Sequence, residues 1–453
     1  MLNFLFILLR IKSNNSSGPF VFYLSILGFI GIVSLIAIIL FKWKDFLLLM
    51  LIIKPFIDIT VNAPLLGLGG TDFNALELSA LIIFLVALVK YASITRKSKI
   101  FNHSFIWLFI VLQLISYLLS ISDGHQSFIY GVKFFLRLLG GYFIYFIAVD
   151  TIDSLEKQLK LFKVIWITSL IAGVITIFIY YTGFSNFDAT KGQTRFNGLY
   201  NDPGTPSYLS VICLLFGILY KELSKDNFST FLKWVYYFSW FVTLFIMAIT
   251  LTKSALLMFV VFIIMYFGVH RKKLILVIPL LFLGIYLSFS TFDALNERFQ
   301  DEINYAQDNS DEDIRSLGTG RVNRWSNLLD FFENELDLPS QLIGTSSQFQ
   351  AHNQYMAYLM QVGIIGLLVF LFILLRFFIR LHQMNRSPQV SAAKTLLVMY
   401  CVYALTGCPF NYTTLLWYLM ILLALINVKP IKKNQLIRDQ KSRSNIKPIL
   451  ITS

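Results

Sequence analysis

The chain has 453 residues, of which 57% are hydrophobic and 14% charged, and its mean hydropathy is +0.68. This composition excludes a water-soluble surface and indicates a chain that lies in a lipid bilayer. An aromatic share of 16% excludes a disordered or fibrous chain, and three cysteines in 453 residues exclude a disulfide-stabilised secreted scaffold.

The formal net charge of +13 is unevenly distributed. Residues 291–352 contain twelve acidic and four basic residues, a net charge of −8, so the remaining residues carry +21. The basic residues gather in short connections between apolar runs, as the positive-inside rule of membrane proteins describes. The charge therefore gives no reason to expect a nucleic-acid partner.

Apolar runs long enough to cross a bilayer core of about 30 Å cover most of the sequence. In chain order they lie at 20–41, 44–60, 74–91, 101–121, 128–149, 157–182, 204–222, 230–251, 253–269, 272–290, 353–380, 392–408 and 411–428. We therefore predict an all-α polytopic membrane protein of about 12–14 transmembrane helices.

Alternate connections carry the basic residues, which places those connections in the cytoplasm. They are the connections with Arg96, Lys97 and Lys99; Lys157, Lys160 and Lys163; Lys221, Lys225 and Lys233; Arg271, Lys272 and Lys273; and Arg376, Arg380 and Arg386. The tail 429–453 is also basic and is expected inside. The connections expected outside are 61–73, 122–127, 183–203, 291–352 and 409–410.

The position of the N-terminus is left open. Thirteen runs with an inside C-terminus would place it outside, although Arg10 and Lys12 favour the cytoplasm. Either residues 2–11 form a further segment or one of the first two runs does not cross. Pro55, flanked by Lys54 and Asp58, makes 44–60 the suspect. We expect no cleaved signal peptide, because the bases follow the first apolar run.

Four parts are expected along the chain. Residues 1–290 form transmembrane helices with the short outer loop 183–203, and 291–352 form one long acidic outer loop with helices of its own. Residues 353–428 form the C-terminal transmembrane helices, and 429–453 form the cytoplasmic tail. Within the runs, Lys133 and Arg137 are the clearest charges, and polar residues concentrate in the outer connections, which favours chemistry at the outer face over transport.

The first polar connection reads GFSNFDATKGQTRFNGLYNDPGTPSYLS and contains Arg195. A guanidinium fork among glycines suits a phosphate or diphosphate. The same arginine could instead pair with Asp202 or with lipid phosphates. At the outer end of run 253–269, Lys253 opposes the helix dipole and needs either a bound anion or a route to the lipid headgroups.

The long acidic loop predicts two helices, one with Phe292, Leu295, Phe299 and Ile303 on one face and a second capped by Thr319. Arg321 and Arg324 fall in the first turns of the second helix, where free N–H groups already attract an anion. They could instead simply neutralise the surrounding acids. The D-x-D of Asp311 and Asp313 has a spacing used by metal-dependent sugar transferases, but it arises easily by chance in an acidic run, and we expect no metal.

The loop ends at His352 and Asn353, where the chain re-enters the membrane. Of five histidines, only His352 combines an outward position with a following Asn and a nearby arginine-bearing helix start. Such a histidine is often structural, but as a base it suits removal of a proton from an alcohol near neutral pH.

Taken together, these motifs resemble the O-antigen ligase and polymerase superfamily of bacterial membrane glycosyltransferases. The resemblance covers about residues 160–425 and rests on the order of four motifs. They are R-x-x-G at Arg195 and Gly198, T-x-S at Thr252 to Ser254, G-R-x-x-x-W at Gly320, Arg321 and Trp325, and I-G…H-N-x-Y…G-I-I-G at Gly344, His352, Asn353, Tyr355, Gly363 and Gly366.

The resemblance implies a helical GT-C-type fold and a metal-independent, inverting transfer from an undecaprenyl-diphosphate-linked donor at the outer face, without a cofactor. It implies that Arg195 binds diphosphate and that His352 is the catalytic histidine, with Arg321 as the loop arginine. Lys253 and Arg324 are further candidates for donor binding, and Asn353, Trp325 and Tyr355 are supporting residues. Two departures are Ala255, where the family often has arginine, and Ser346, where a second glycine is common.

By this analogy we expect a polymerase of O-antigen or capsule repeat units in the bacterial inner membrane, acting on a lipid-linked donor and a glycan acceptor, with a chain-length regulator as a possible partner. A ligase that transfers the finished lipopolysaccharide glycan to lipid A-core is the first alternative. A lipid-linked oligosaccharide flippase is the alternative from another class. It would depend on cations within the spans, such as Lys133 or Arg137, and not on His352.

Overall fold

The computed structural model describes most of the helical part of the chain. The described residues are 46–59, 64–68, 71–94, 100–122, 128–182, 187–190, 193–196, 200, 204–224, 228–250, 252–268, 321–345 and 351–427. The expected runs 20–41 and 272–290, the first helix of the acidic loop, the D-x-D motif and the basic tail lie outside them.

The described helices follow the apolar runs closely. The first group comprises α3 (Phe46–Ile59), α4 (Ala75–Ser93), α5 (His103–Ser122), α6 (Phe128–Thr151), α7 (Leu155–Thr182), α8 (Gly204–Ser224), α9 (Thr230–Thr250) and α10 (Lys253–Phe262) with its π-helical extension η4 (Ile263–Phe267). The second comprises α13 (Arg321–Asn334), α14 (Leu338–Ile343), α15 (Gln354–Gln383), α16 (Pro388–Tyr403), α17 (Thr413–Ala424) and the 3₁₀ turns η6 (Pro409–Asn411) and η7 (Leu425–Asn427).

Two short antiparallel hairpins interrupt the helical pattern. Strands β1 (Pro64–Leu68) and β2 (Thr71–Asn74) form one, and β3 (Phe187–Thr190) and β4 (Gln193–Phe196) form the other. Both lie in connections that were expected to face outward, and neither was expected from the sequence. They are isolated pairs and leave the fold class unchanged.

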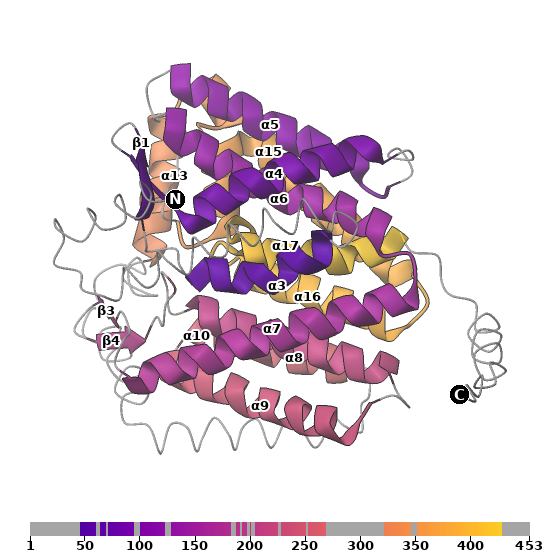
Figure 1. Cartoon of the computed structure of the whole chain (residues 1–453). Helices are drawn as coiled ribbons and strands as arrows, with labels where there is room; N and C mark the ends of the chain where they lie inside the picture. The colour runs from indigo at the N-terminus through magenta and orange to yellow at the C-terminus, as the bar shows by residue number, and fades with distance from the viewer. Residues whose placement is uncertain are drawn as a thin grey trace, which may run out of the picture.

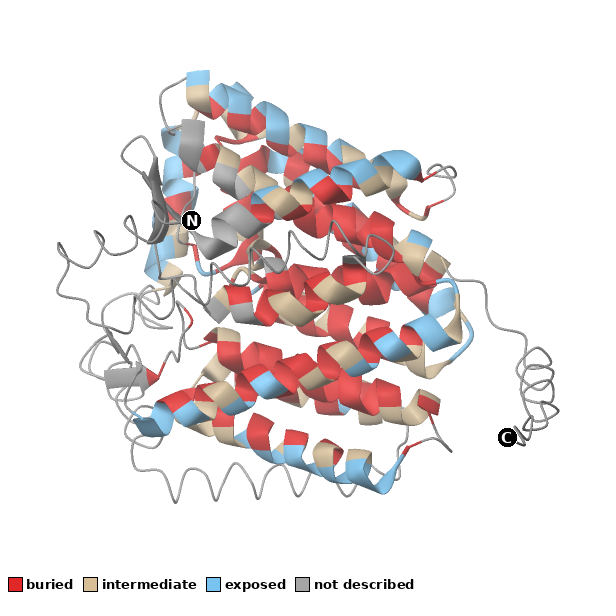
Figure 2. Ribbon diagram, viewed as in Figure 1, coloured by how far each residue is buried: buried red, intermediate tan, exposed pale blue. Residues whose placement is uncertain are grey.

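The helices pack side by side into a bundle in which α17 lies against α6, and α8 lies between α7 and α9 (Figure 1). Burial is greatest in the middle of the bundle, and the outermost helices α5 and α9 expose one side (Figure 2). The exposed side chains of α9 include Phe231 and Trp234, which are 74% and 72% accessible. Large exposed aromatic side chains of this kind are expected on a surface that faces lipid.

Five described helices are long and apolar enough to cross a membrane, which confirms an all-α polytopic membrane protein. They are α5, α7, α8, α9 and α15. Among the starts of the described helices, that of α16 differs most from the prediction, which placed the run at 392–408. The Ser387 hydroxyl accepts from the Val390 N–H, and Pro388 takes the first helical position, so the helix begins before its apolar part.

Run 44–60, whose crossing of the membrane was left open, forms the 14-residue helix α3, and Pro55 does not end it. The helix continues to Ile59 with Pro55 inside it, and the neighbouring Lys54 is 1% exposed. Its ammonium group pairs with Asp58, one turn further along the same helix. The two charges that made this run doubtful therefore neutralise each other.

Candidate active site

Described parts of three connections that were expected to face outward, 61–73, 183–203 and 291–352, lie at one end of the bundle (Figure 1). Figure 1 shows β1, β3, β4 and α13 together at its left end. Helices α8 and α15 begin directly after 183–203 and 291–352, and α17 begins shortly after the outward connection 409–410. The positive ends of several helix dipoles therefore meet at this end, which suits an anionic ligand.

His352 is held by its two neighbours. Its own side chain is exposed, whereas Ala351 is fully buried and Asn353 is 8% exposed. Asn353 caps α15, because its side-chain oxygen accepts from the N–H groups of Tyr355 and Met356 at 2.9 and 3.1 Å. The histidine thus projects from a short segment that is anchored on both sides.

The backbone of His352 has φ of 47°, which is uncommon for a residue with a side chain. Such conformations cost about 1–3 kcal/mol and occur often at functional sites. Within the described residues, Asn102 is the other non-glycine residue in this region. The conformation turns the chain from the loop into α15 and presents the imidazole at that corner.

Gln354 joins the start of α15 to the connection between α16 and α17. Its backbone N–H donates to the Ala404 carbonyl at 2.8 Å, and its side chain donates to Asn411 Oδ1 at 3.1 Å. The Phe410 N–H donates to Gln354 Oε1 at 3.0 Å. This buried glutamine was not singled out from the sequence, because a lone Gln at a helix start has no distinctive pattern.

Helix α13 brings the arginine-bearing loop to the histidine. The Trp325 indole N–H donates to the Ala351 carbonyl at 2.7 Å. Leu328 and Phe332, on the same helix, are buried against Ala351 and the first turns of α15. Trp325 was expected to be a supporting residue, and its indole nitrogen fastens α13 beside His352.

Arg321 and Arg324 lie in the first turn of α13, which begins at Arg321. Arg321 is partly buried and lies one helical turn before Trp325, so the two share a helix face. Arg324 is exposed. The indole contact therefore places the first turn of α13, with both arginines, near the segment that carries His352.

Two glycines explain how the acidic loop docks on α15. Helix α15 has a kink at Gly363, with φ of 67° and ψ of −173°. A Cβ there would lie 2.4 Å from the Leu342 carbonyl, and a Cβ on Gly344 would lie 2.4 Å from the Gln361 carbonyl. The end of α14 thus crosses α15 backbone against backbone, and the Thr345 N–H donates to the Met360 carbonyl at 3.0 Å.

Lys253 is the first residue of α10. It is partly exposed, whereas Ala255 is fully buried. An arginine at position 255 would therefore enter the core, and the cation of this helix start is Lys253. Beside it, the Tyr208 hydroxyl is hydrogen-bonded to Ser254.

Arg195 lies in the hairpin β3–β4, where the strand register places it opposite Asp188. The next residue, Phe196, is buried, and its ring packs edge-on against Tyr180 at a centroid distance of 5.1 Å. The register makes Asp188 its cross-strand neighbour. Asp202, the alternative partner that the sequence offered, lies outside the described residues.

Tyr355 has a structural contact of its own. Its hydroxyl donates to the Cys401 carbonyl at 3.0 Å and so joins α15 to α16.

The contacts of Trp325 and Asn353 bring His352 and Asn353 together with the helix of Arg321, Arg324 and Trp325. Lys253 and Arg195 belong to separate elements that begin or end at the same end of the bundle.

Comparison with known protein families adds one finding. The family model described as O-antigen ligase matches residues 238–371. The matched segment runs from α9 into α15 and includes Lys253, the described part of the acidic loop and His352, whereas Arg195 precedes it. The match confirms the resemblance stated above and supports membership of the O-antigen ligase and polymerase superfamily. No curated protein matches the chain.

Proposed function

We propose that this member of the O-antigen ligase and polymerase superfamily is a membrane glycosyltransferase that joins undecaprenyl-diphosphate-linked repeat units into a polysaccharide. The observation that supports this most is the corner at His352. There an exposed imidazole is held between two buried residues, beside a helix whose first turn carries two arginines.

In the proposed reaction, a hydroxyl oxygen of the acceptor sugar attacks the anomeric carbon of the donor. A new C–O bond forms as the bond from that carbon to the diphosphate oxygen breaks, and the lipid diphosphate leaves. His352 takes the hydroxyl proton, which a histidine does well near neutral pH. Attack from the face opposite the leaving group inverts the anomeric configuration.

The leaving diphosphate gains negative charge as the bond breaks. Arg195, Lys253, Arg321 and Arg324 are the cations that we assign to it, and fixed cations stabilise a developing anion without reorganising at the moment of reaction. With four such groups available, we infer that the transfer needs no metal ion. Asn353 and Trp325 serve this site by holding His352 and α13.

We place the site on the outer face of the bacterial inner membrane, with the C-terminus in the cytoplasm. The support is the alternation of basic connections along the sequence, which assigns the connections at this end of the bundle to the outside. The polymerase is preferred to the ligase by analogy with other acidic-looped polymerases. A deletion strain distinguishes them, because one repeat on the lipid core indicates a polymerase and no repeat indicates a ligase.

Purified protein in detergent, supplied with lipid-linked donor and acceptor, tests the proposal. Elongation without a membrane gradient is expected of an enzyme and not of a flippase. His352→Ala should lower the rate by about 100-fold or more, the usual contribution of a general base. His382→Ala is the matched control, because His382 is also exposed and lies in the last turn of α15, the helix that follows His352. Full elongation by His352→Ala would refute the assignment.

A further inference from the structure

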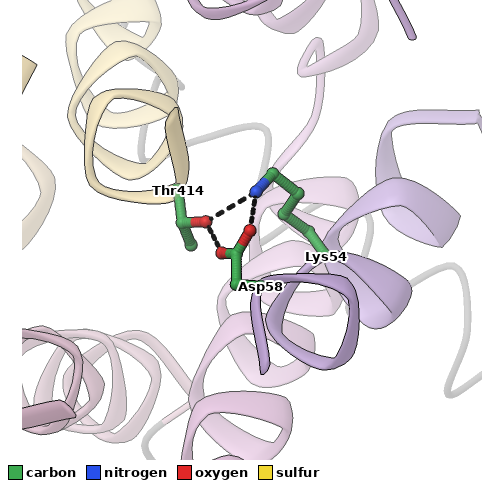
Figure 3. Close-up of polar contacts among 3 residues, drawn as sticks. All are labelled: Lys54, Asp58 and Thr414. Carbon is green, nitrogen blue, oxygen red and sulfur yellow. Dashed lines mark hydrogen bonds and ion pairs between the residues drawn. The ribbon is translucent and has the colours of Figure 1, made fainter. Parts of the chain in front are cut away.

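A buried ion pair connects α3 with the start of α17. Lys54 and Asp58 pair with each other, and both contact the Thr414 hydroxyl, with 2.9 Å between Lys54 Nζ and Thr414 Oγ1 (Figure 3). The Lys54 side chain is 2% exposed and that of Asp58 is 12% exposed. The Lys54 ammonium group also lies 5.5 Å from the ring centroid of Trp417.

Stability alone is a weak reason for this arrangement. Moving two charges from water into a protein interior costs several kcal/mol per ion, and apolar residues of similar volume often give an equally stable or more stable protein. Ionisable residues inside membrane proteins are accordingly rare and generally belong to functional sites. The mechanism proposed above does not use any of the three residues.

On the α17 side, a short series of contacts links the ion pair to the segment that carries His352. Thr414 follows η6 by three residues, and Asn411 at the end of η6 accepts from the Gln354 side chain. Gln354 lies two residues after His352. The Asp58–Thr414 contact holds the start of α17 to α3, and the Asn411–Gln354 contact holds η6 to the start of α15. Together they fix the position of the segment that carries His352.

On the other side, α3 shares a buried core with the connection that carries Arg195. Tyr200, five residues after Arg195 and just before α8 begins, is 4% exposed and belongs to the core that includes Met50 and Leu51 of α3 and Leu416 of α17. Burial and, next, the Asp58 carboxylate raise the pKa of the Tyr200 hydroxyl.

We propose, on the basis of the function proposed above, that Lys54, Asp58 and Thr414 are positioning residues for the transfer. They hold the start of α17 and the Tyr200 segment to α3, and thereby fix the spacing between the Arg195 hairpin and His352. They do not touch substrate. Their loss should lower kcat and leave the KM for the lipid-linked donor nearly unchanged.

Thr414 offers the cleanest test. Thr414→Val keeps the shape of the side chain and removes the hydroxyl, whereas Thr414→Ser keeps the hydroxyl. We expect Thr414→Val to lower kcat about 10- to 100-fold, as a small misplacement of catalytic groups does, and Thr414→Ser to retain most of it. The matched control is Ser239→Ala, which removes another buried contact, the acceptor of the Trp166 indole N–H at 2.9 Å. Equal kcat in Thr414→Val and wild type would overturn the proposal.

The double variant Lys54→Met, Asp58→Leu distinguishes a positioning role of the ion pair from a contribution to folding stability. We expect it to melt no lower than wild type but to lose kcat as Thr414→Val does, and adding Thr414→Val should lower kcat no further. Hydrogen exchange supplies a readout without substrate, with faster exchange expected at 351–354 and 409–414. A fully active double variant would overturn the proposal. If this variant fails to accumulate, the comparison of kcat between Thr414→Val and Thr414→Ser tests the proposal.

The two proposals fail differently. If His352→Ala elongates normally, the proposed function is wrong whatever the α3 variants do. If His352→Ala is inactive while Thr414→Val and the double variant retain wild-type kcat, the site stands and the positioning role is wrong.

Discussion

Replacing Gly363 by alanine should undock the acidic loop from α15. The residue has φ of 67° and ψ of −173°, a region that is almost confined to glycine and costs other residues about 1–3 kcal/mol. The new Cβ would also lie 2.4 Å from the Leu342 carbonyl, which is backbone and cannot turn aside. Overpacking of this kind costs about 1–3 kcal/mol more, so we expect a total of about 2–6 kcal/mol.

The matched control is Gly140→Ala in α6. A Cβ at Gly140 would meet its nearest neighbour, Ile83 Cγ2, at 3.9 Å, which is an ordinary contact. Because alanine favours a helix interior over glycine, this variant should be unchanged or more stable by about 0.5–1 kcal/mol.

Thermal unfolding in detergent and the elongation assay measure both effects. Gly363→Ala should melt well below wild type and lose kcat, because α13 and its arginines are carried by the segment that crosses Gly363. Equal melting temperatures for Gly363→Ala and Gly140→Ala would refute the backbone crossing.

Two further predictions concern residues 351–354 at the start of α15. Asn353→Ala should destabilise the start of α15 by about 1 kcal/mol and lower kcat, whereas Asn353→Asp keeps the capping oxygen and should retain both; a difference in melting temperature between the two checks this. Trp325→Phe removes the donor to the Ala351 carbonyl, so we expect about 1 kcal/mol less stability and faster hydrogen exchange at 351–353, and unchanged exchange would contradict it.

Much of the fold follows from the sequence, because the length and hydropathy of each run are local properties. The runs 204–222 and 230–251 became Gly204–Ser224 and Thr230–Thr250, with shifts of no more than two residues. The hairpins escaped prediction because strands such as QTRF are short and sit in polar connections without a clear alternating pattern. The early start of α16 depends on a serine cap and a proline, which hydropathy does not detect.

The candidate site was predicted as a set of residue types, and its geometry was not. The loop arginines and His352 were singled out separately, and the indole contact of Trp325 brings their segments together. The role of Gln354 depends on partners about 50 residues away, which one sequence does not reveal. Lys54 and Asp58 made run 44–60 doubtful as a membrane span, although their spacing of four places them on one helix face, where opposite charges pair.

The site requires the Arg195 hairpin and the His352 corner to meet at the membrane surface. Cysteines placed at 195 and 352, in a background without Cys213, Cys401 and Cys408, test this with a short bifunctional thiol reagent. The pair 188 and 195, opposite each other in the hairpin, is the positive control. We expect the 195–352 pair to cross-link rapidly and the lipid-linked donor to slow the reaction. Absence of the 195–352 cross-link, with the control pair fully linked, would contradict a shared site for diphosphate binding and proton removal.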